Sequence, residues 1–190
     1  KTKLGQRLST SSGHASMGFG LPGAIGACCG NNRNDTICIS GDGGLQMNIQ
    51  ELQTIVHYNL PIKLFVLNNN GYLTIKSTQQ NHFGRFVGAE KSSGVTCPDI
   101  IKVAAAYGLP TATIVNTEEL NMKIDSILQT PGPIVCEIIM SENQPLIPRV
   151  SSLKKPDGTI ISKPIEDLYP FLSREEFFED MIVEPIEILK

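Results

Sequence analysis

Two short groups of polar and small residues have the side chains needed to hold a metal-bound diphosphate. The first is Gly41-Asp42-Gly43 and the second is Asn68-Asn69, with 24 residues (44–67) between them. An Asp carboxylate and an Asn carbonyl are hard oxygen ligands that suit Mg²⁺, which completes its near-octahedral shell with phosphate oxygens and water. Gly43 and Gly44 would let backbone N–H groups approach a phosphate closely. Together the two groups predict a magnesium diphosphate site.

Two buried strands joined by a helix are expected to bring these groups together. Residues 36–40 and 62–67 are short apolar runs bounded by turn residues, as buried strands are. Between them, apolar residues recur at helical spacing over 45–58, and Pro61 stops the pattern. The strands of such a unit are parallel, so their carboxyl ends share the edge of the sheet where open α/β folds bind ligands. Asp42 and Asn69 are therefore expected at one edge.

Two alternatives start from the same glycines and turns. Taken alone, each of the two polar groups consists of residue types that are common in turns and loops, so each could be a turn without a ligand. In addition, Gly18-x-Gly20-x-x-Gly23 matches the dinucleotide-binding fingerprint, opens an expected helix and precedes a strand that leads to Asp42. That fingerprint requires a strand before its first glycine, whereas residues 5–16 are small and polar. A nicotinamide- or flavin-binding Rossmann oxidoreductase is the alternative, and it leaves Asn68-Asn69 unexplained.

The combined motifs resemble the diphosphate-binding domain of thiamine diphosphate (ThDP) enzymes, specifically the acetolactate synthase group. Residues 16–27 (SMGFGLPGAIGA) are similar to that family's MGFGLPAAIGA segment, and residues 46–52 (QMNIQEL) form a further shared block. The resemblance covers most of residues 11–139. It implies an α/β fold, a three-layer doubly wound parallel sheet, in a diphosphate-binding domain over residues 1–140. Further strands are expected over 111–115 and 134–140, with helices over 98–107 and after Asn116.

The resemblance also implies which residues bind the cofactor. Asp42, Asn69 and the backbone carbonyl of Gly71 are implied as Mg²⁺ ligands. ThDP contacts are implied for Ala15, Ser16, Met17, Gly41, Gly43, Gly44, Asn69, Gly71, Tyr72 and Leu73. Met17 would support the bent cofactor, and Ala15 stands where the family usually has Gly.

The segment 71–80 is expected to form a helix that, in the family, lines the substrate channel. True acetohydroxyacid synthases carry a Met near Thr74 and a Trp near Thr78, and this chain contains no Trp. Two small hydroxyl side chains would leave a roomier, more polar pocket, which suits an acceptor such as a keto sugar. His14 falls beside the implied position of the cofactor ring, where proton transfer and a plain local hydrogen bond are both open interpretations.

The activity implied by the resemblance is ThDP- and Mg²⁺-dependent decarboxylation of a 2-oxo acid such as pyruvate, followed by carboligation to an acceptor carbonyl. In the family the catalytic glutamate lies on a separate pyrimidine-binding domain, usually of a partner subunit. We therefore expect an N-terminally truncated fragment that is inactive alone and belongs to a homodimer or homotetramer. Whether a missing domain carries FAD stays open. A non-catalytic cofactor-binding module is a third hypothesis.

Composition limits the remaining classes of function. A chain of 190 residues with 41% apolar content can bury the core of one domain. Its net charge of -3 gives no basic surface for nucleic acid, and no apolar stretch approaches the roughly 20 residues that span a bilayer. Five cysteines without CxxC spacing and no signal peptide favour the cytoplasm. Beyond residue 140, scattered prolines predict an extended, Pro-rich arm over 141–190.

Overall fold

The computed structural model describes residues 2–11 and 13–184, and the chain divides into two compact units between Gln144 and Pro145. The division falls four residues after the boundary expected from the sequence. Within the described residues, no helix combines the length and the apolar character needed to cross a membrane. Each unit is described by itself below.

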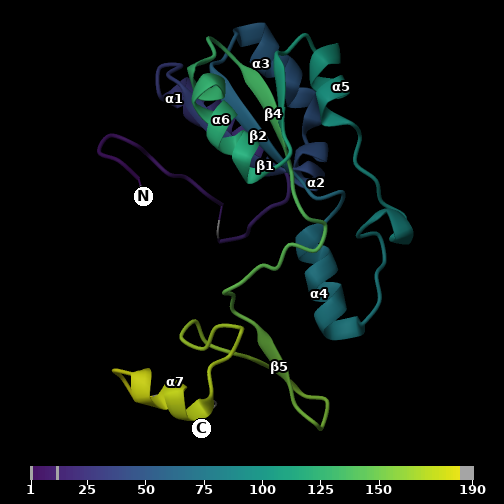
Figure 1. Ribbon diagram of the computed structural model, residues 1–190, viewed down its shortest axis with the longest axis vertical. Coiled ribbons are helices and arrows are strands. Elements are labelled where there is room, and N and C mark those ends of the chain that lie inside the picture. The colour runs from purple at the N-terminus through teal and green to yellow at the C-terminus, as the bar shows by residue number, and fades with distance from the viewer. Residues whose placement is uncertain (1, 12, 185–190) are drawn as a thin grey trace. The chain divides into compact units, whose positions relative to one another are not determined.

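The first unit is built on a parallel sheet of four strands (Figure 1). The strands lie in the order β1-β2-β4-β3, and every neighbouring pair is parallel. Their bounds are Thr36–Gly41 for β1, Ile62–Asn68 for β2, Thr111–Ile114 for β3 and Ile134–Ile139 for β4. Each strand lies within one residue of its predicted range at both ends. The central strands β2 and β4 are buried over most of their length, as their continuous apolar sequences predict.

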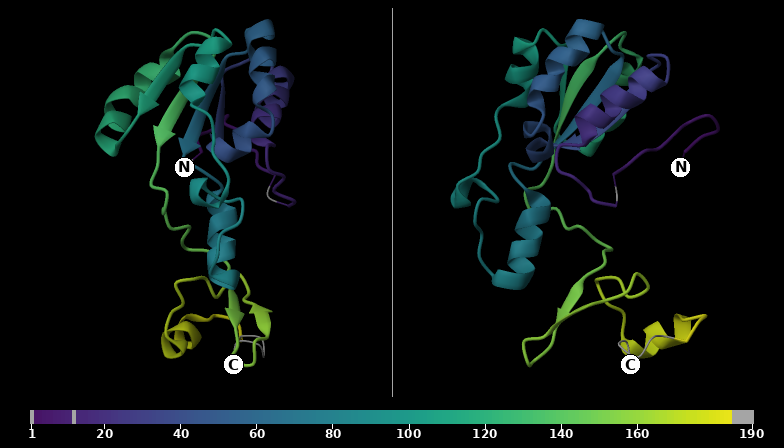
Figure 2. Two further views of the ribbon diagram at one scale, coloured as in Figure 1. Left: turned by 90° about the vertical axis from the view of Figure 1, so that its right-hand side faces the viewer. Right: turned by 180° about the vertical axis from the view of Figure 1, so that it is seen from behind.

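Helices cover both faces of this sheet, so the predicted three-layer α/β fold is confirmed (Figure 2). Three helices pack on one face: α1 (Gly20–Gly30), α3 (Leu52–Tyr58) and α5 (Ile100–Ala106). The other face is covered by α6 (Thr117–Gln129), which begins after Asn116 as predicted. The Asn116 side chain accepts a hydrogen bond from the Glu119 amide and caps this helix.

The crossover between β1 and β2 differs from the single helix predicted over 45–58. It contains α2 (Asp42–Gln46), the short 3₁₀ helix η1 (Ile49–Glu51) and then α3. Asn48 leaves the helical conformation, with φ at -140°, and its amide Nδ2 donates to the carbonyl of Gly18 at 2.8 Å. The prediction of one helix was wrong because this side chain bonds a distant backbone group instead of facing solvent.

A buried lysine interrupts the apolar sequence of β2. The Lys63 side chain is only 2% exposed, and its Nζ donates to the carbonyl oxygens of Thr130 and Gly132, in the turn between α6 and β4. Two carbonyl acceptors compensate for removing the ammonium group from water. Lys63 therefore ties the start of β2 to the turn that leads into β4.

The second unit is more regular than the extended arm expected from its prolines. Strands β5 (Ser152–Lys154) and β6 (Ile160–Ser162) form an antiparallel hairpin, and α7 (Arg174–Asp180) follows. The sequence Pro156-Asp157-Gly158, a typical turn sequence, forms the turn between the two strands. There the Asp157 carboxylate accepts from the Thr159 amide, and Gly158 adopts a φ of +87°.

A buried carboxylate lies at the centre of this second unit. Asp167 is 1% exposed; its Oδ2 accepts from Lys163 Nζ at 2.7 Å, and Arg174 donates to both of its oxygens at 2.9 and 3.0 Å. The aromatic ring of Phe177, which is also buried, lies beneath the Arg174 guanidinium at 4.7 Å. A short-range ionic cluster thus stabilises a unit in which, among the described residues, Phe177 is the one buried apolar side chain.

Candidate functional site

The carboxyl ends of β1 and β2 lie in register, so the residues that follow them meet at one edge of the sheet (Figure 1). Asp42 begins α2 and is only 6% exposed. Its Oδ1 accepts a hydrogen bond from the Gly43 amide at 2.9 Å, and its Oδ2 accepts one from the Gly71 amide at 3.1 Å. The two predicted segments are therefore in direct contact.

The environment of Asp42 includes a residue that sequence reasoning missed. Burial raises the pKa of the Asp42 carboxyl, and hydrogen bonds from the Gly43 and Gly71 amides and from the Cys97 thiol oppose that rise. Burial, followed by the charge of Asp42, raises the pKa of Cys97 to about 11. No motif or spacing pointed to Cys97, because its place beside Asp42 depends on the path of the loop before α5.

The loop after β2 contains one side-chain amide, that of Asn69, that bonds none of the described residues. Both ends of the Asn68 side chain are bonded within the chain: Oδ1 accepts from the Asn70 backbone amide at 2.9 Å, and Nδ2 donates to Glu137 Oε1 at 2.7 Å. Asn70 has a φ of +58°, which completes the turn. Asn69 is half-buried, and its side-chain amide group makes no hydrogen bond to any of the described residues. Its oxygen can therefore serve an external ligand.

The chemistry of these groups fits a small hard cation carrying a diphosphate. Asp42, the Asn69 amide and the Gly71 carbonyl are all oxygen donors, and only one of them is charged. Across the described residues, no three His, Cys, Asp or Glu side chains gather in a way that could hold a metal. A single carboxylate leaves Mg²⁺ with a net positive charge, which an anionic diphosphate complements.

Gly43 provides a close-packed position in this site. A Cβ at Gly43 would lie 2.2 and 2.3 Å from atoms Cδ1 and Cε1 of the Tyr72 ring, and 3.4 Å from Cε of Met17. The structure thus brings together predicted cofactor residues that are far apart in sequence. In contrast, a Cβ at Gly44 would make an ordinary contact of 3.5 Å with Ser40 Oγ, and one at Gly41 would meet no atom within 4 Å.

The loop before α1 is exposed and carries a left-handed residue. His14, Ala15, Ser16 and Met17 are all exposed, and Ala15 has a φ of +48°. That conformation is strained for any residue with a Cβ, which agrees with the Gly that the resembled family usually has there. Within the described part of the chain, no hydrogen bond or ion pair joins His14 to Asp42, so the role of His14 stays a prediction.

Helix α4 (Leu73–Phe83) presents the two predicted channel residues on one face. Thr74 and Thr78 are exposed and lie one turn apart, and the Thr78 hydroxyl donates to the Thr74 carbonyl at 3.0 Å. The helix begins two residues after Gly71, whose amide donates to Asp42. The two hydroxyl groups therefore lie on the helix that directly follows this contact. Their role in a substrate channel stays a prediction.

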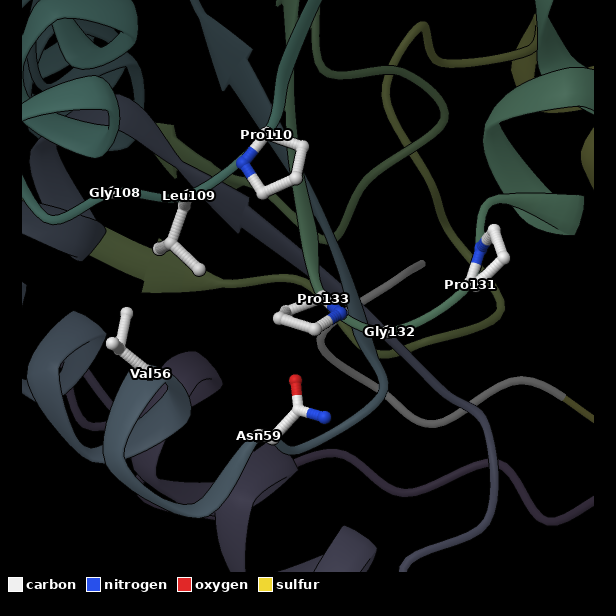
Figure 3. A pocket seen from close by; sticks show the side chains of 8 residues that line it. All are labelled: Val56, Asn59, Gly108, Leu109, Pro110, Pro131, Gly132 and Pro133. Atoms are coloured by element: carbon white, nitrogen blue, oxygen red, sulfur yellow. The ribbon is translucent and has the colours of Figure 1, made fainter.

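A hollow of about 330 Å³ lies at the opposite, amino edge of the sheet (Figure 3). Its lining consists of Val56, Asn59, Gly108, Leu109, Pro110, Pro131, Gly132 and Pro133. None of these side chains can titrate or act as a nucleophile, and Asn59 alone among them offers an oxygen ligand, with no carboxylate beside it in the lining. The hollow therefore does not compete with the Asp42 edge as the candidate site.

A parallel sheet with helices on both faces and a buried carboxylate at its carboxyl edge has the architecture of an α/β ligand-binding domain. More particularly, the chain belongs to the thiamine pyrophosphate enzymes: residues 1–138 match the family described as "Thiamine pyrophosphate enzyme, C-terminal TPP binding domain". This match does not favour the nicotinamide-binding alternative.

Several curated relatives are acetolactate synthases. The chain is 37% identical to the acetolactate synthase large subunit of Cyanidium caldarium over 152 residues, which are 80% of this chain and 26% of the relative. It is 37% identical to that of Pyropia yezoensis over 166 residues, 86% of this chain and 28% of the relative. Acetolactate synthase 2, chloroplastic, of Nicotiana tabacum is 34% identical over 148 residues, which are 75% of this chain and 22% of the relative. The chain thus spans about a quarter of the length of these relatives.

Proposed function

We propose that this chain is the cofactor-anchoring part of a ThDP- and Mg²⁺-dependent enzyme of the acetolactate synthase type. The observation that carries the proposal is the contact between the buried Asp42 carboxylate and the Gly71 amide, in the loop that also carries Asn69 two residues before Gly71. This arrangement places three oxygen donors of the kind that Mg²⁺ prefers at the ends of adjacent parallel strands.

The chain's own residues would divide the work of holding the cofactor. Asp42, Asn69 and the Gly71 carbonyl would bind the metal. The amides of Gly43 and Gly44 would hold the diphosphate, with the Gly43 amide shared with Asp42 Oδ1. Main-chain groups around Ala15 and Ser16, with Met17 and Tyr72, would orient the rings and exclude water from them. When bound, ThDP supplies an electron sink that stabilises a carbanion.

The proposed reaction is decarboxylation of a 2-oxo acid, pyruvate above all, followed by carboligation to an acceptor carbonyl. The catalytic glutamate would come from another domain or subunit, so this chain alone is expected to be inactive. The working enzyme would be a cytoplasmic homodimer or homotetramer, with no role for nucleic acid or membrane. Whether it carries FAD depends on a domain outside these residues.

Thr74 and Thr78 support a proposal for the acceptor. Their exposed side chains occupy one face of α4, where the resemblance to true acetohydroxyacid synthases would place Met and Trp. The smaller and more polar surface suits a keto sugar better than a second pyruvate. Assaying the intact protein for acetolactate formation from pyruvate tests this choice of acceptor, and efficient acetolactate synthesis would overturn it.

Calorimetry tests the cofactor proposal directly. Wild-type protein is expected to bind ThDP in the presence of Mg²⁺, to lose that binding when EDTA removes the metal, and to show no binding of NAD. Asp42→Ala should weaken Mg²⁺-dependent binding at least about tenfold, or 1.4 kcal/mol. Asp35→Ala, which alters an exposed carboxylate at the other end of β1, is the matched control. Binding of NAD but not of ThDP by the intact protein would contradict the proposal.

A further inference from the structure

Lys76 on α4 connects three segments around the metal loop, defined here as residues 69–71. Its side chain is 16% exposed, and its Nζ forms an ion pair with Glu90 Oε2 at 2.5 Å. On its other side, the same Nζ donates to Asn143 Oδ1 at 3.0 Å and to the Glu142 carbonyl at 3.4 Å. One ammonium group thus joins α4, the loop after it and the segment that follows β4.

Both segments bound by Lys76 also contact the metal loop. Gly71 pairs with Glu90 in an antiparallel bridge, and the adjacent Tyr72 amide donates to the Ala89 carbonyl at 2.8 Å. From the other side, Asn70 Nδ2 donates to Glu142 Oε1 at 2.7 Å. Lys76 therefore bonds to both of the segments that contact the metal loop, one on each side of it.

The contact between Gly71 and its neighbour leaves little room for movement. Gly71 has a φ of +157°, and a Cβ there would lie 2.6 Å from the Ala89 carbonyl oxygen. The Glu90 side of the contact is itself fixed, because Ser92 Oγ donates to Glu90 Oε1 at 2.6 Å and the Glu90 amide donates to Ser93 Oγ at 3.0 Å. The hydrogen bond from Lys76 also lowers the pKa of Glu90.

Lys76 gives up the freedom of a long side chain to make these contacts. Immobilising a lysine costs up to about 2 kcal/mol of rotamer entropy, so an ordinary surface lysine stays in solvent. Lys102 on α5 behaves in that way: its side chain is 83% exposed although it pairs with Asp99 at 3.1 Å. The held position of Lys76 points to a function in organising its surroundings.

We propose that Lys76 is a positioning residue for the metal loop, an inference that rests on the proposed function. By fixing Glu90 on one side and the 142–143 segment on the other, Lys76 holds the Asn69 amide and the Gly71 carbonyl toward Asp42. It acts through these neighbours and is not a ligand of the metal or of the diphosphate.

Amide hydrogen exchange tests the positioning role without any ligand. Lys76→Met should accelerate exchange of the Tyr72 amide about tenfold, which corresponds to 1.4 kcal/mol of local opening. Lys76→Arg, which keeps the charge, should restore most of the protection, and Lys102→Met should leave it unchanged. Glu90→Gln removes the ion pair from the other partner and should reproduce the local effect if Lys76→Met does not fold.

Titration with Mg²⁺ at fixed ThDP gives the second measurement, on the intact protein. The Mg²⁺ concentration for half-maximal binding should rise about tenfold in Lys76→Met and stay unchanged in Lys102→Met. If wild-type protein binds no Mg²⁺ and ThDP, the proposed function fails, whereas the exchange experiment still decides the positioning role. Unchanged exchange at Tyr72, or equal acceleration at the sheet amide of Phe65, would overturn the inference.

Discussion

Replacing Gly43 by alanine should destabilise the first unit, because the added methyl group would collide with the Tyr72 ring. The new Cβ would lie 2.2 and 2.3 Å from two ring carbons, far inside van der Waals contact. The ring cannot stay where it is, and Met17 Cε at 3.4 Å narrows the space on another side. Gly44, the next residue in the same helix, provides a matched control, since its Cβ would meet only Ser40 Oγ at 3.5 Å.

The size of the effect follows from two opposing contributions. Inserting a methyl group into a packed site costs about 1–3 kcal/mol, and replacing glycine by alanine within a helix returns up to about 1 kcal/mol. Gly43→Ala is therefore expected to lower the free energy of unfolding by about 0–2 kcal/mol, and by about 1–3 kcal/mol relative to Gly44→Ala, in which the helix contribution cancels. Gly44→Ala gains the higher helix propensity of alanine without a collision, so it should leave the free energy of unfolding unchanged or raise it by up to about 1 kcal/mol.

Urea unfolding followed by far-ultraviolet circular dichroism measures these differences at constant m-value. A Tyr72→Ala background completes a double-mutant cycle, in which the penalty of Gly43→Ala should disappear because the ring is gone. The reasoning is refuted if Gly43→Ala is as stable as Gly44→Ala, or if its penalty persists in the Tyr72→Ala background.

Two further predictions concern ionisable groups. Arg174, and then Lys163, lowers the pKa of the buried Asp167 carboxyl, so this group's stabilisation of the second unit is complete above the ordinary Asp pKa of about 3.9 and is lost as the pH falls through the lowered value. Hydrogen exchange in α7 should show this loss, and Asp167→Asn should remove the pH dependence at a cost of about 1–3 kcal/mol; an unaltered pH profile would contradict it. At pH 8, iodoacetamide should alkylate exposed Cys29 well before Cys97, whose pKa of about 11 leaves roughly one thiolate in a thousand. Equal rates by peptide mass spectrometry would count against the placement of Cys97 beside Asp42.

The elements that could be predicted from the sequence are those fixed by local pattern. The four strands of the first sheet are short, largely apolar or β-branched runs between turn residues, and Asn116 has the side chain that caps a helix. The meeting of Asp42 with the loop after β2 was predictable as well, because parallel strands of a crossover end at one edge of the sheet.

The features that escaped prediction depend on contacts between distant segments. The break after α2 depends on the bond from Asn48 to Gly18, thirty residues earlier, and no local pattern encodes it. The approach of Cys97 to Asp42 and of Lys76 to Asn143 depends on how long loops pack. In the second unit, prolines indicated irregular structure, whereas the hairpin arises from the turn at 156–158.

Lys63 sets the alignment of the two central strands. Side chains alternate between the faces of a sheet, so a shift of one residue in β2 would point this ammonium group away from the Thr130 and Gly132 carbonyls. Other pairings of two mostly apolar strands would bury similar area, but only one lets this lysine reach its acceptors. The alignment determines where the far end of β2 stops relative to β4, and hence the height of the loop whose Gly71 amide meets Asp42. A lysine near the start of β2 thereby fixes the position of the loop that follows the end of the same strand.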